Sequence, residues 1–318
     1  MVNSIIEEIR RNSSFLITTH EGPDGDAVGS SLALAGYLAS QGKRVTVHMA
    51  DGVPDLYMFL PGAADVVRKI PDADYDVAFV LDVGEVRRAG HEFNMFSRIG
   101  KIINVDHHLG CENFGFLNLI DPRAAATGCL VYRILRAAEA PITYDVAVCL
   151  YTAVITDTGS FRYSNANREA FTVAGEMIDS GVDAWFVSEH LYESQPRNRL
   201  ELLSLALTTL DIAPRGDYAS ITVTLDMYER TGGNAELTDG FVNYPRSIRG
   251  VEVAVFFREI KQGLFKVGFR SKGKVNVAAL AEHFGGGGHH NAAGCTVAGK
   301  YGDVKKAVSS YLEKALPV

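Results

Sequence analysis

The chain of 318 residues is long enough for two domains, and its 47% hydrophobic and 22% charged residues are typical of a globular protein. No apolar stretch approaches the roughly 20 residues that a membrane-spanning helix needs, and the N-terminus lacks the basic and apolar regions of a signal peptide. The four cysteines stand far apart, which excludes zinc-type spacing and is typical of reduced thiols. We therefore expect a soluble, cytoplasmic protein.

The net charge of −7 is unevenly distributed along the chain. Residues 1–189 contain 15 basic and 25 acidic residues, a net charge of −10, whereas residues 190–318 contain 16 basic and 13 acidic residues, a net charge of +3. An acidic half can hold cations while a basic half meets an anion. Surface charge that only keeps the protein in solution would give the same totals, and charge alone favours that second interpretation.

Strands and helices are predicted to alternate through the first 190 residues. Hydrophobic patterning predicts strands at 14–20, 44–50, 76–84 and 101–108, and helices at 26–42, 125–140, 143–161 and 168–181. Gly42 and Pro141 mark the ends of two of these helices. Strands that alternate with helices indicate a parallel sheet covered by helices on both faces.

A second unit follows a predicted connecting helix over 191–212. Its expected strands cover 218–225, 251–260 and 264–271. Its expected helices cover 275–284 and 303–316. β-branched and aromatic residues dominate the strands. The expected fold class is therefore α/β, with a parallel-sheet domain over 1–190, the connecting helix, and a smaller α/β domain over 213–318.

Acidic and histidine side chains gather after three predicted strands and one helix. They are His20, Asp24 and Asp26; Asp82; Asp106, His107 and His108; and Asp157. Because sites in open α/β sheets form at the carboxyl ends of strands, one crevice can collect them. Taken singly, each group has an ordinary explanation, such as a helix cap, a loop aspartate or a solvated turn. Several buried acids together, however, need a compensating positive charge, and oxygen and imidazole ligands without thiolate favour Mn²⁺ or Mg²⁺ over structural zinc.

The motifs HEGPDGDAVGS, VLDVGE, VDHH and ITDTGSF occur in an order and spacing that resemble those of the DHH phosphoesterase superfamily. The segment FGGGGHHNAAG over 284–294 is similar to the signature of the DHH-associated C-terminal domain, so the resemblance covers nearly the whole chain. The likeness is greatest to nanoRNases that also act as phosphatases on 3′-phosphoadenosine 5′-phosphate. The resemblance implies a catalytic, metal-binding DHH domain followed by a substrate-binding domain.

The resemblance implies two metal ions, with Mn²⁺ expected and Mg²⁺ or Co²⁺ as alternatives. The ligands of one ion would be His20, Asp24 and Asp82. The ligands of the other would be Asp26, Asp82, His107 and Asp157, so that Asp82 bridges. Such a pair can activate water and stabilise the attacking and leaving oxygens of a phosphoester.

Other residues near these ligands receive supporting roles. Asp106 would orient an imidazole, and His108 would face the substrate phosphate as a hydrogen-bond donor or general acid. Gly22 and Gly25 would permit the sharp backbone path that sends Asp24 and Asp26 to different ions.

Substrate phosphate is expected at the glycine-rich segment, whose residues by resemblance are Gly286, Gly287, Gly288 and His289. A run of glycines lets backbone N–H groups approach an anion, although four glycines can also form a flexible linker. Arg270 and Arg162 are the expected substrate contacts. Other cations among the second-unit strands, Arg258 and Lys266 included, are expected to be mostly solvated.

The expected function is a Mn²⁺-dependent phosphoesterase with its substrate between the domains. It would hydrolyse short oligoribonucleotides to nucleoside monophosphates and dephosphorylate 3′-phosphoadenosine 5′-phosphate to AMP. The alternatives are a linear or cyclic dinucleotide phosphodiesterase, a RecJ-type single-strand exonuclease, a pyrophosphatase or polyphosphatase, and a non-catalytic nucleotide-binding regulatory module. The expected partners are short RNA and small phosphonucleotides, and no membrane partner is expected. A homodimer is one of the oligomeric states that the sequence allows.

Overall fold

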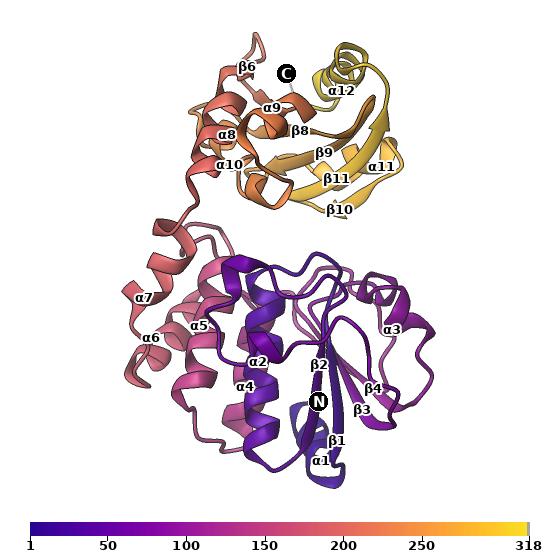
Figure 1. The fold of residues 1–318 in the computed structure, drawn as a ribbon, viewed down its shortest axis with the longest axis vertical. Helices are drawn as coiled ribbons and strands as arrows, with labels where there is room; N and C mark the ends of the chain where they lie inside the picture. The colour runs from indigo at the N-terminus through magenta and orange to yellow at the C-terminus, as the bar shows by residue number, and fades with distance from the viewer. Residues whose placement is uncertain (317–318) are drawn as a thin grey trace. The chain divides into compact units, whose positions relative to one another are not determined.

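The computed structural model describes residues 1–316, apart from the side chain of His289. The chain forms two compact units, one over Met1–Ser194 and the other from Gln195 onward, and each has a sheet of its own (Figure 1). Within the described residues, no helix is long and apolar enough to cross a membrane.

Unit 1 is built on a five-stranded parallel sheet in the order β2-β1-β3-β4-β5. Its strands are β1 (Ser14–Thr18), β2 (Arg44–His48), β3 (Tyr75–Leu81), β4 (Ile99–Asp106) and β5 (Leu117–Ile120). Strand β1 is buried along its whole length and β3 at all but one residue, as their nearly continuous apolar sequences predict. The sequence analysis does not predict β5, because four residues give too short a pattern.

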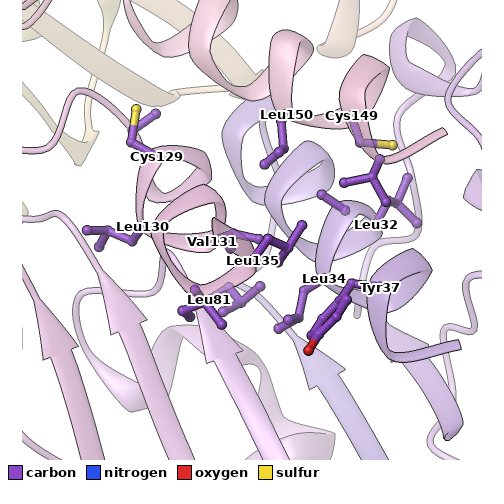
Figure 2. Packing of buried hydrophobic residues seen from close by; sticks show 14 of the residues in the cluster. Leu32, Leu34, Tyr37, Leu81, Cys129, Leu130, Val131, Leu135, Cys149 and Leu150 are labelled. Atoms are coloured by element: carbon purple, nitrogen blue, oxygen red, sulfur yellow. The ribbon is translucent and has the colours of Figure 1, made fainter. Parts of the chain in front are cut away.

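Helices cover both faces of this sheet, which confirms the predicted fold class. They are α1 (Val2–Arg11), α2 (Gly25–Ser40), α3 (His91–Met95), α4 (Thr127–Ala137), α5 (Tyr144–Asp157), α6 (Arg168–Asp179) and α7 (Ala184–Ser188), with short turns η1 (Asp55–Tyr57), η2 (Ala63–Asp65), η3 (Val86–Ala89) and the π-helical η4 (Glu189–Glu193). The larger core lies on the face of α1, α2 and α4. Figure 2 shows Leu34 of α2, Leu135 of α4 and Leu150 of α5 in this core, together with Leu81 of β3. A smaller core, around Phe93 of α3, occupies the other face.

Unit 2 has a six-stranded mixed sheet in the order β10-β11-β9-β8-β7-β6, in which only the β7–β8 pair is parallel. Its strands are β6 (Asp211–Ile212), β7 (Tyr218–Val223), β8 (Val253–Lys261), β9 (Leu264–Ser271), β10 (Gly287–His289) and β11 (Ala292–Ala298). Its helices are α8 (Arg197–Thr208), α9 (Leu225–Thr231), α10 (Asn243–Ser247), α11 (Val277–His283) and α12 (Tyr301–Ala315), with a short turn η5 (Glu236–Thr238).

The two faces of the second sheet carry separate cores. One core joins the sheet to α11 and α12, and its centre includes Val267, Phe269 and Leu280. The other core lies at the β7 end of the opposite face, where Leu202 and Ala206 of α8 pack with Ile221. Helix α8 lies within the predicted connecting helix over 191–212 and is part of the core of unit 2.

Candidate metal centre

The predicted metal ligands of unit 1 come from strand ends that the parallel sheet places at one edge. His20 follows β1 by two residues, Asp82 directly follows β3, and His107 directly follows β4. Strands β1, β3 and β4 are neighbours in the sheet, so these three side chains meet. Asp157, the last residue of α5, joins them because α5 packs against α2.

Three overlapping groups of donor atoms result, and in each group the atoms lie within 4.8 Å of one another. The groups are His20, Asp24 and Asp82; Asp26, His107 and Asp157; and Asp82, His107 and His108. Asp82 Oδ2 lies 3.9 Å from His20 Nε2, while its Oδ1 lies 3.5 Å from His107 Nε2. Asp82 therefore turns one carboxylate oxygen toward each side of the cluster, as a bridging ligand would.

Asp82 has a strained backbone, and a hydrogen bond holds its side chain in this position. Its φ of +60° is left-handed, which costs free energy in a residue other than glycine and is often stored at functional sites. The hydroxyl of Thr127, at the start of α4, donates to Asp82 Oδ1 at 3.0 Å. Burial, and then the negative charges of Asp26 and Asp24, hold the pKa of Asp82 well above its ordinary value.

Asp24 combines the two roles that the sequence offered as alternatives, a helix cap and a position in the cluster. Its Oδ1 accepts hydrogen bonds from the N–H groups of Asp26 and Ala27 and so caps α2. Its Oδ2 lies 4.0 Å from His20 Nε2. Its side chain is 58% exposed, whereas the other acids of the cluster are mostly buried.

Asp26 binds the N-terminus of α4. The N–H of Thr127 donates to its Oδ2 at 2.6 Å and the N–H of Gly128 donates to its Oδ1 at 2.9 Å, where the helix dipole favours negative charge. Even so, burial raises the pKa of Asp26 to about 7, although the nearby His107 acts in the opposite direction. Asp26 Oδ2 also lies 3.8 Å from His107 Nε2.

Of the two glycines predicted to shape the first motif, one acts as predicted and the other does not. Gly22 has a φ of +63°, as the predicted sharp path requires. The prediction for Gly25 is wrong, because Gly25 begins α2 without a left-handed backbone. A Cβ at Gly25 would instead lie 2.4 Å from Thr156 Oγ1, and one at Gly29 would lie 2.4 Å from the carbonyl oxygen of Cys149. Both glycines let α2 pack closely on α5, which brings Asp157 to the cluster.

Asp157 contacts His107 and Asn165. Its Oδ2 lies 3.7 Å from His107 Nε2 and accepts a hydrogen bond from Asn165 Nδ2 at 3.0 Å. The same amide group donates to the carbonyl of Ala125, just before α4. Burial raises the pKa of Asp157 to about 6. Burial acts to lower the pKa of His107, but the negative charges of Asp157 and Asp26 outweigh it and raise that pKa.

Asp106 holds the ring of His108. Its Oδ1 accepts the backbone N–H of His108 at 2.6 Å and lies 2.8 Å from His108 Nδ1, while its Oδ2 accepts the N–H of Gly84 at 2.6 Å. Burial alone would raise the pKa of Asp106. The hydrogen bonds and charge of His108 outweigh burial and hold that pKa below its ordinary value.

The donor chemistry of this cluster fits divalent metal ions. Among residues 1–316, no lysine or arginine forms an ion pair with Asp26, Asp82 or Asp157. Burial raises the pKa of these three carboxyl groups even though His107 lies near, so their ionised forms need further positive charge. Carboxylate and imidazole donors without thiolate suit Mn²⁺ and Mg²⁺.

The predicted substrate contacts lie in both units. Arg162 of unit 1 follows three successive left-handed residues, Gly159, Ser160 and Phe161, and its Nε donates to the carbonyl of Gly159 at 2.7 Å. Arg270 of unit 2 lies half-buried on β9, and its Nη1 donates to the carbonyl of Phe269 at 3.0 Å.

The glycine run is part of a sheet, so the alternative of a flexible linker is wrong. Gly287 and Gly288 lie in β10, which pairs with β11. A Cβ at Gly286 would lie 2.2 Å from the carbonyl oxygen of Gly294, and one at Gly288 would lie 2.5 Å from Ala293 Cα. A Cβ at Gly287 would meet no atom within 4 Å. The predicted role of His289 concerns a side chain outside the described part of the structure.

Comparison with known proteins accounts for both units. Residues 14–154 match the DHH family, N-terminal domain, and residues 219–314 match the DHHA1 domain. A Thermus thermophilus protein, named bifunctional oligoribonuclease and PAP phosphatase NrnA, is 34% identical over 93% of this chain and 87% of its own length. The chain belongs to the DHH family. The predicted family and enzyme class are thereby confirmed, and this DHH protein is a phosphoesterase.

Solved structures agree with the DHH fold. A crystal structure of an exopolyphosphatase-related protein from Bacteroides fragilis is 30% identical, with a TM-score of 0.93 over 98% of this chain and 95% of the other. RecJ from Thermus thermophilus, solved in complex with Mn²⁺, is 16% identical with a TM-score of 0.57, and the match covers 99% of this chain and 54% of RecJ. The RecJ comparison extends to the fold alone.

Sequence reasoning did not single out Thr127 or Asn165, which bond to the predicted ligands. Thr127 lies within a predicted helix, and a small hydroxyl residue near a helix start is a signal that could have identified it. Asn165 gives no comparable local signal, because its partners Asp157 and Ala125 are set by tertiary packing.

Proposed function

We propose that this DHH protein hydrolyses short oligoribonucleotides to nucleoside monophosphates and removes the 3′-phosphate of 3′-phosphoadenosine 5′-phosphate, with two bound divalent ions, Mn²⁺ foremost. The observation that carries the proposal is the shared position of Asp82 between His20 and His107. The name of the Thermus thermophilus relative, which includes both activities, supports the substrate class.

The chain offers a ligand set for each ion. One would be held by His20, Asp24 and Asp82, and the other by Asp26, Asp82, His107 and Asp157. When bound, such a pair would supply positive charge that polarises a phosphoester and lowers the pKa of an attacking water. Asp26 serves this arrangement well, because the N–H groups of α4 fix both of its oxygens without neutralising its charge.

The residues around the ligands supply orientation and a proton. Asp106 lies against Nδ1 of His108 and so fixes the ring. With Nδ1 against Asp106, Nε2 of His108 is left for a substrate oxygen, to which it donates a hydrogen bond or passes a proton as the leaving group departs. In unit 2, Arg270 and the backbone N–H groups of the glycine-rich strand bind a substrate phosphate.

The proposal is tested by a substrate panel with product analysis by mass. Metal-stripped protein is supplied with Mn²⁺, Mg²⁺ or Co²⁺ and given a diribonucleotide, 3′-phosphoadenosine 5′-phosphate, a cyclic dinucleotide, a long single-stranded DNA, and inorganic polyphosphate. We expect nucleoside monophosphates from the diribonucleotide and AMP from 3′-phosphoadenosine 5′-phosphate, fastest with Mn²⁺. Hydrolysis of polyphosphate alone, or nucleotide binding without turnover at any metal concentration, would contradict it.

A further inference from the structure

One face of the unit 2 sheet carries two cations in direct opposition. Along β9, Phe265, Val267 and Phe269 point into the core with α11 and α12, so Lys266, Gly268 and Arg270 share the other face. Arg258 of β8 lies directly opposite Lys266 in the antiparallel register. Like charges at directly opposed positions destabilise a sheet, so folding alone gives no reason for this pair.

The pair is not neutralised within the protein. Among the described residues, neither Arg258 nor Lys266 forms an ion pair; Arg258 Nη1 donates to the carbonyl of Ala235 at 3.2 Å, and the Arg258 side chain also interacts with the hydroxyl of Tyr228, which is a neutral partner. Although the Lys266 side chain is exposed, partial desolvation and then the charge of Arg258 lower its pKa, as expected for a cation without a nearby carboxylate. Thr296 of β11 flanks Lys266 on its other side and adds a hydroxyl.

A second cost to folding lies beside the pair. Gly268 occupies the middle of β9, without a left-handed φ, and a Cβ there would meet no atom within 4 Å. Its neighbour Gly294 on β11 also lacks a side chain, although there a Cβ would lie 3.2 Å from the carbonyl oxygen of Val267, so packing favours glycine at that position. Glycine inside a strand weakens it, and where neither backbone nor packing requires glycine, close approach of a ligand is the remaining explanation. Arg270 lies beyond Gly268, about 13 Å along the strand from Lys266.

We propose that Arg258 and Lys266 form a second phosphate subsite, which holds a phosphodiester of the oligonucleotide beyond the phosphate bound at Arg270. The bare backbone at Gly268 and Gly294 lets the intervening nucleotide cross the sheet. This subsite rests on the proposed function and adds a length requirement to it. A trinucleotide has two phosphodiesters, one for Arg270 and one for the cation pair. A dinucleotide has only one phosphodiester and ends short of the pair.

The test compares kcat/KM for a tri- and a diribonucleotide with Mn²⁺. In the double variant Arg258→Gln/Lys266→Gln we expect the tri-to-di ratio to fall about tenfold. The salt dependence of log kcat/KM for the trinucleotide should weaken by about 0.7, the value for one lost single-strand phosphate contact. Gly268→Val should lower the same ratio without lowering Tm, because its side chain enters open space and β-branched residues favour strands. The matched control is Lys261→Gln, at the exposed end of β8, and it should keep the wild-type ratio.

The outcomes separate this inference from the proposed function. In one outcome, wild type hydrolyses the dinucleotide, but the double variant and Gly268→Val have the same tri-to-di ratio of kcat/KM and the same salt dependence as wild type. The subsite is then wrong and the proposed function stands. If wild type hydrolyses neither ribonucleotide with any metal, the proposed function fails and the subsite fails with it.

Discussion

The candidate metal centre of unit 1 and the cationic face of unit 2 are built in opposite ways. In the metal centre, acids such as Asp26 and Asp82 are buried and receive hydrogen bonds from α4 that fix their oxygens. On the face of unit 2, Lys266 is exposed, and its neighbour Gly268 presents only backbone. Metal ligands need fixed geometry, which burial provides, whereas a polymeric anion needs an accessible surface.

The largest expected effect comes from removal of the shared ligand. Asp82→Ala should lower turnover by more than about a hundredfold, the upper range for residues that only support a ligand, because both ions lose a donor. Mn²⁺ stoichiometry, measured by isothermal titration calorimetry, should fall from two toward zero. Asp157→Ala should lose one ion only.

Asp72→Asn is a matched control, because Asp72 is 90% exposed and pairs with Arg98 away from the cluster. Wild-type turnover of Asp82→Ala at limiting Mn²⁺ would show that the two-ion assignment is wrong.

The contribution of α4 to metal binding can be tested by removing a single hydroxyl group, that of Thr127. Thr127→Val removes the hydrogen bond to Asp82 but keeps the backbone N–H that bonds to Asp26. Loss of a group that orients a ligand costs roughly 10- to 100-fold in metal affinity, so Mn²⁺ should bind that much more weakly to the variant. Thr127→Ser restores the hydroxyl and should recover the affinity. Equal affinity of the valine and serine variants would leave the hydroxyl without a role.

Substitutions on the cationic face of unit 2 should weaken substrate binding without changing the affinity for Mn²⁺. Arg270→Ala is expected to raise KM for 3′-phosphoadenosine 5′-phosphate about tenfold while the Mn²⁺ affinity is kept, since the side chain would bind a phosphate rather than an ion. The exposed Arg249 supplies the control Arg249→Ala, which should keep the wild-type KM. A changed Mn²⁺ stoichiometry in Arg270→Ala would break the separation between the two regions.

The smallest expected effect concerns the pH dependence of stability. The pKa values of Asp26 and Asp157 are raised to about 7 and about 6, from 3.8 in the unfolded chain. The metal-free folded state therefore binds more protons than the unfolded state between about pH 4 and pH 7. The contribution of these two carboxyl groups to the free energy of unfolding should therefore be largest below about pH 4 and should fall as the pH rises through this window.

Urea denaturation in EDTA at about pH 5 and about pH 8 measures this slope. Asp26→Asn should reduce the slope, and saturating Mn²⁺ should stabilise the wild type more at the higher pH, because the ionised carboxylates bind metal. A flat profile in EDTA would mean that the buried acids are already balanced by another charge.

The clustering of the predicted ligands could be expected from the sequence because these residues follow strand ends. Asp82 and His107 directly follow apolar strands, and a parallel sheet brings such ends to one edge. From the sequence, a helix cap and a place in the cluster are alternative roles for Asp24. The structure combines them, because Oδ1 of Asp24 caps α2 while Oδ2 lies near His20.

The remaining features depend on contacts that local patterns do not carry. Thr127 bonds to residues 45 and 101 positions away in the chain, and Gly25 is explained only by the approach of Thr156. Strand β10 is three residues long and nearly all glycine, so neither alternation nor β-propensity indicates it. The opposition of Arg258 and Lys266 requires the strand register, which a single sequence does not reveal.

The hydrogen bonds between Asp26 and the start of α4 also have a consequence for folding kinetics. They close a loop of about 100 residues, and the cluster further needs β3, β4 and α5 in place. Contacts of such high sequence separation form late, after the entropy of chain closure has been overcome. A nascent chain that has not yet reached Asp157 cannot complete the second proposed ligand set, so any metal that binds this cluster would bind after unit 1 folds and would then slow its unfolding.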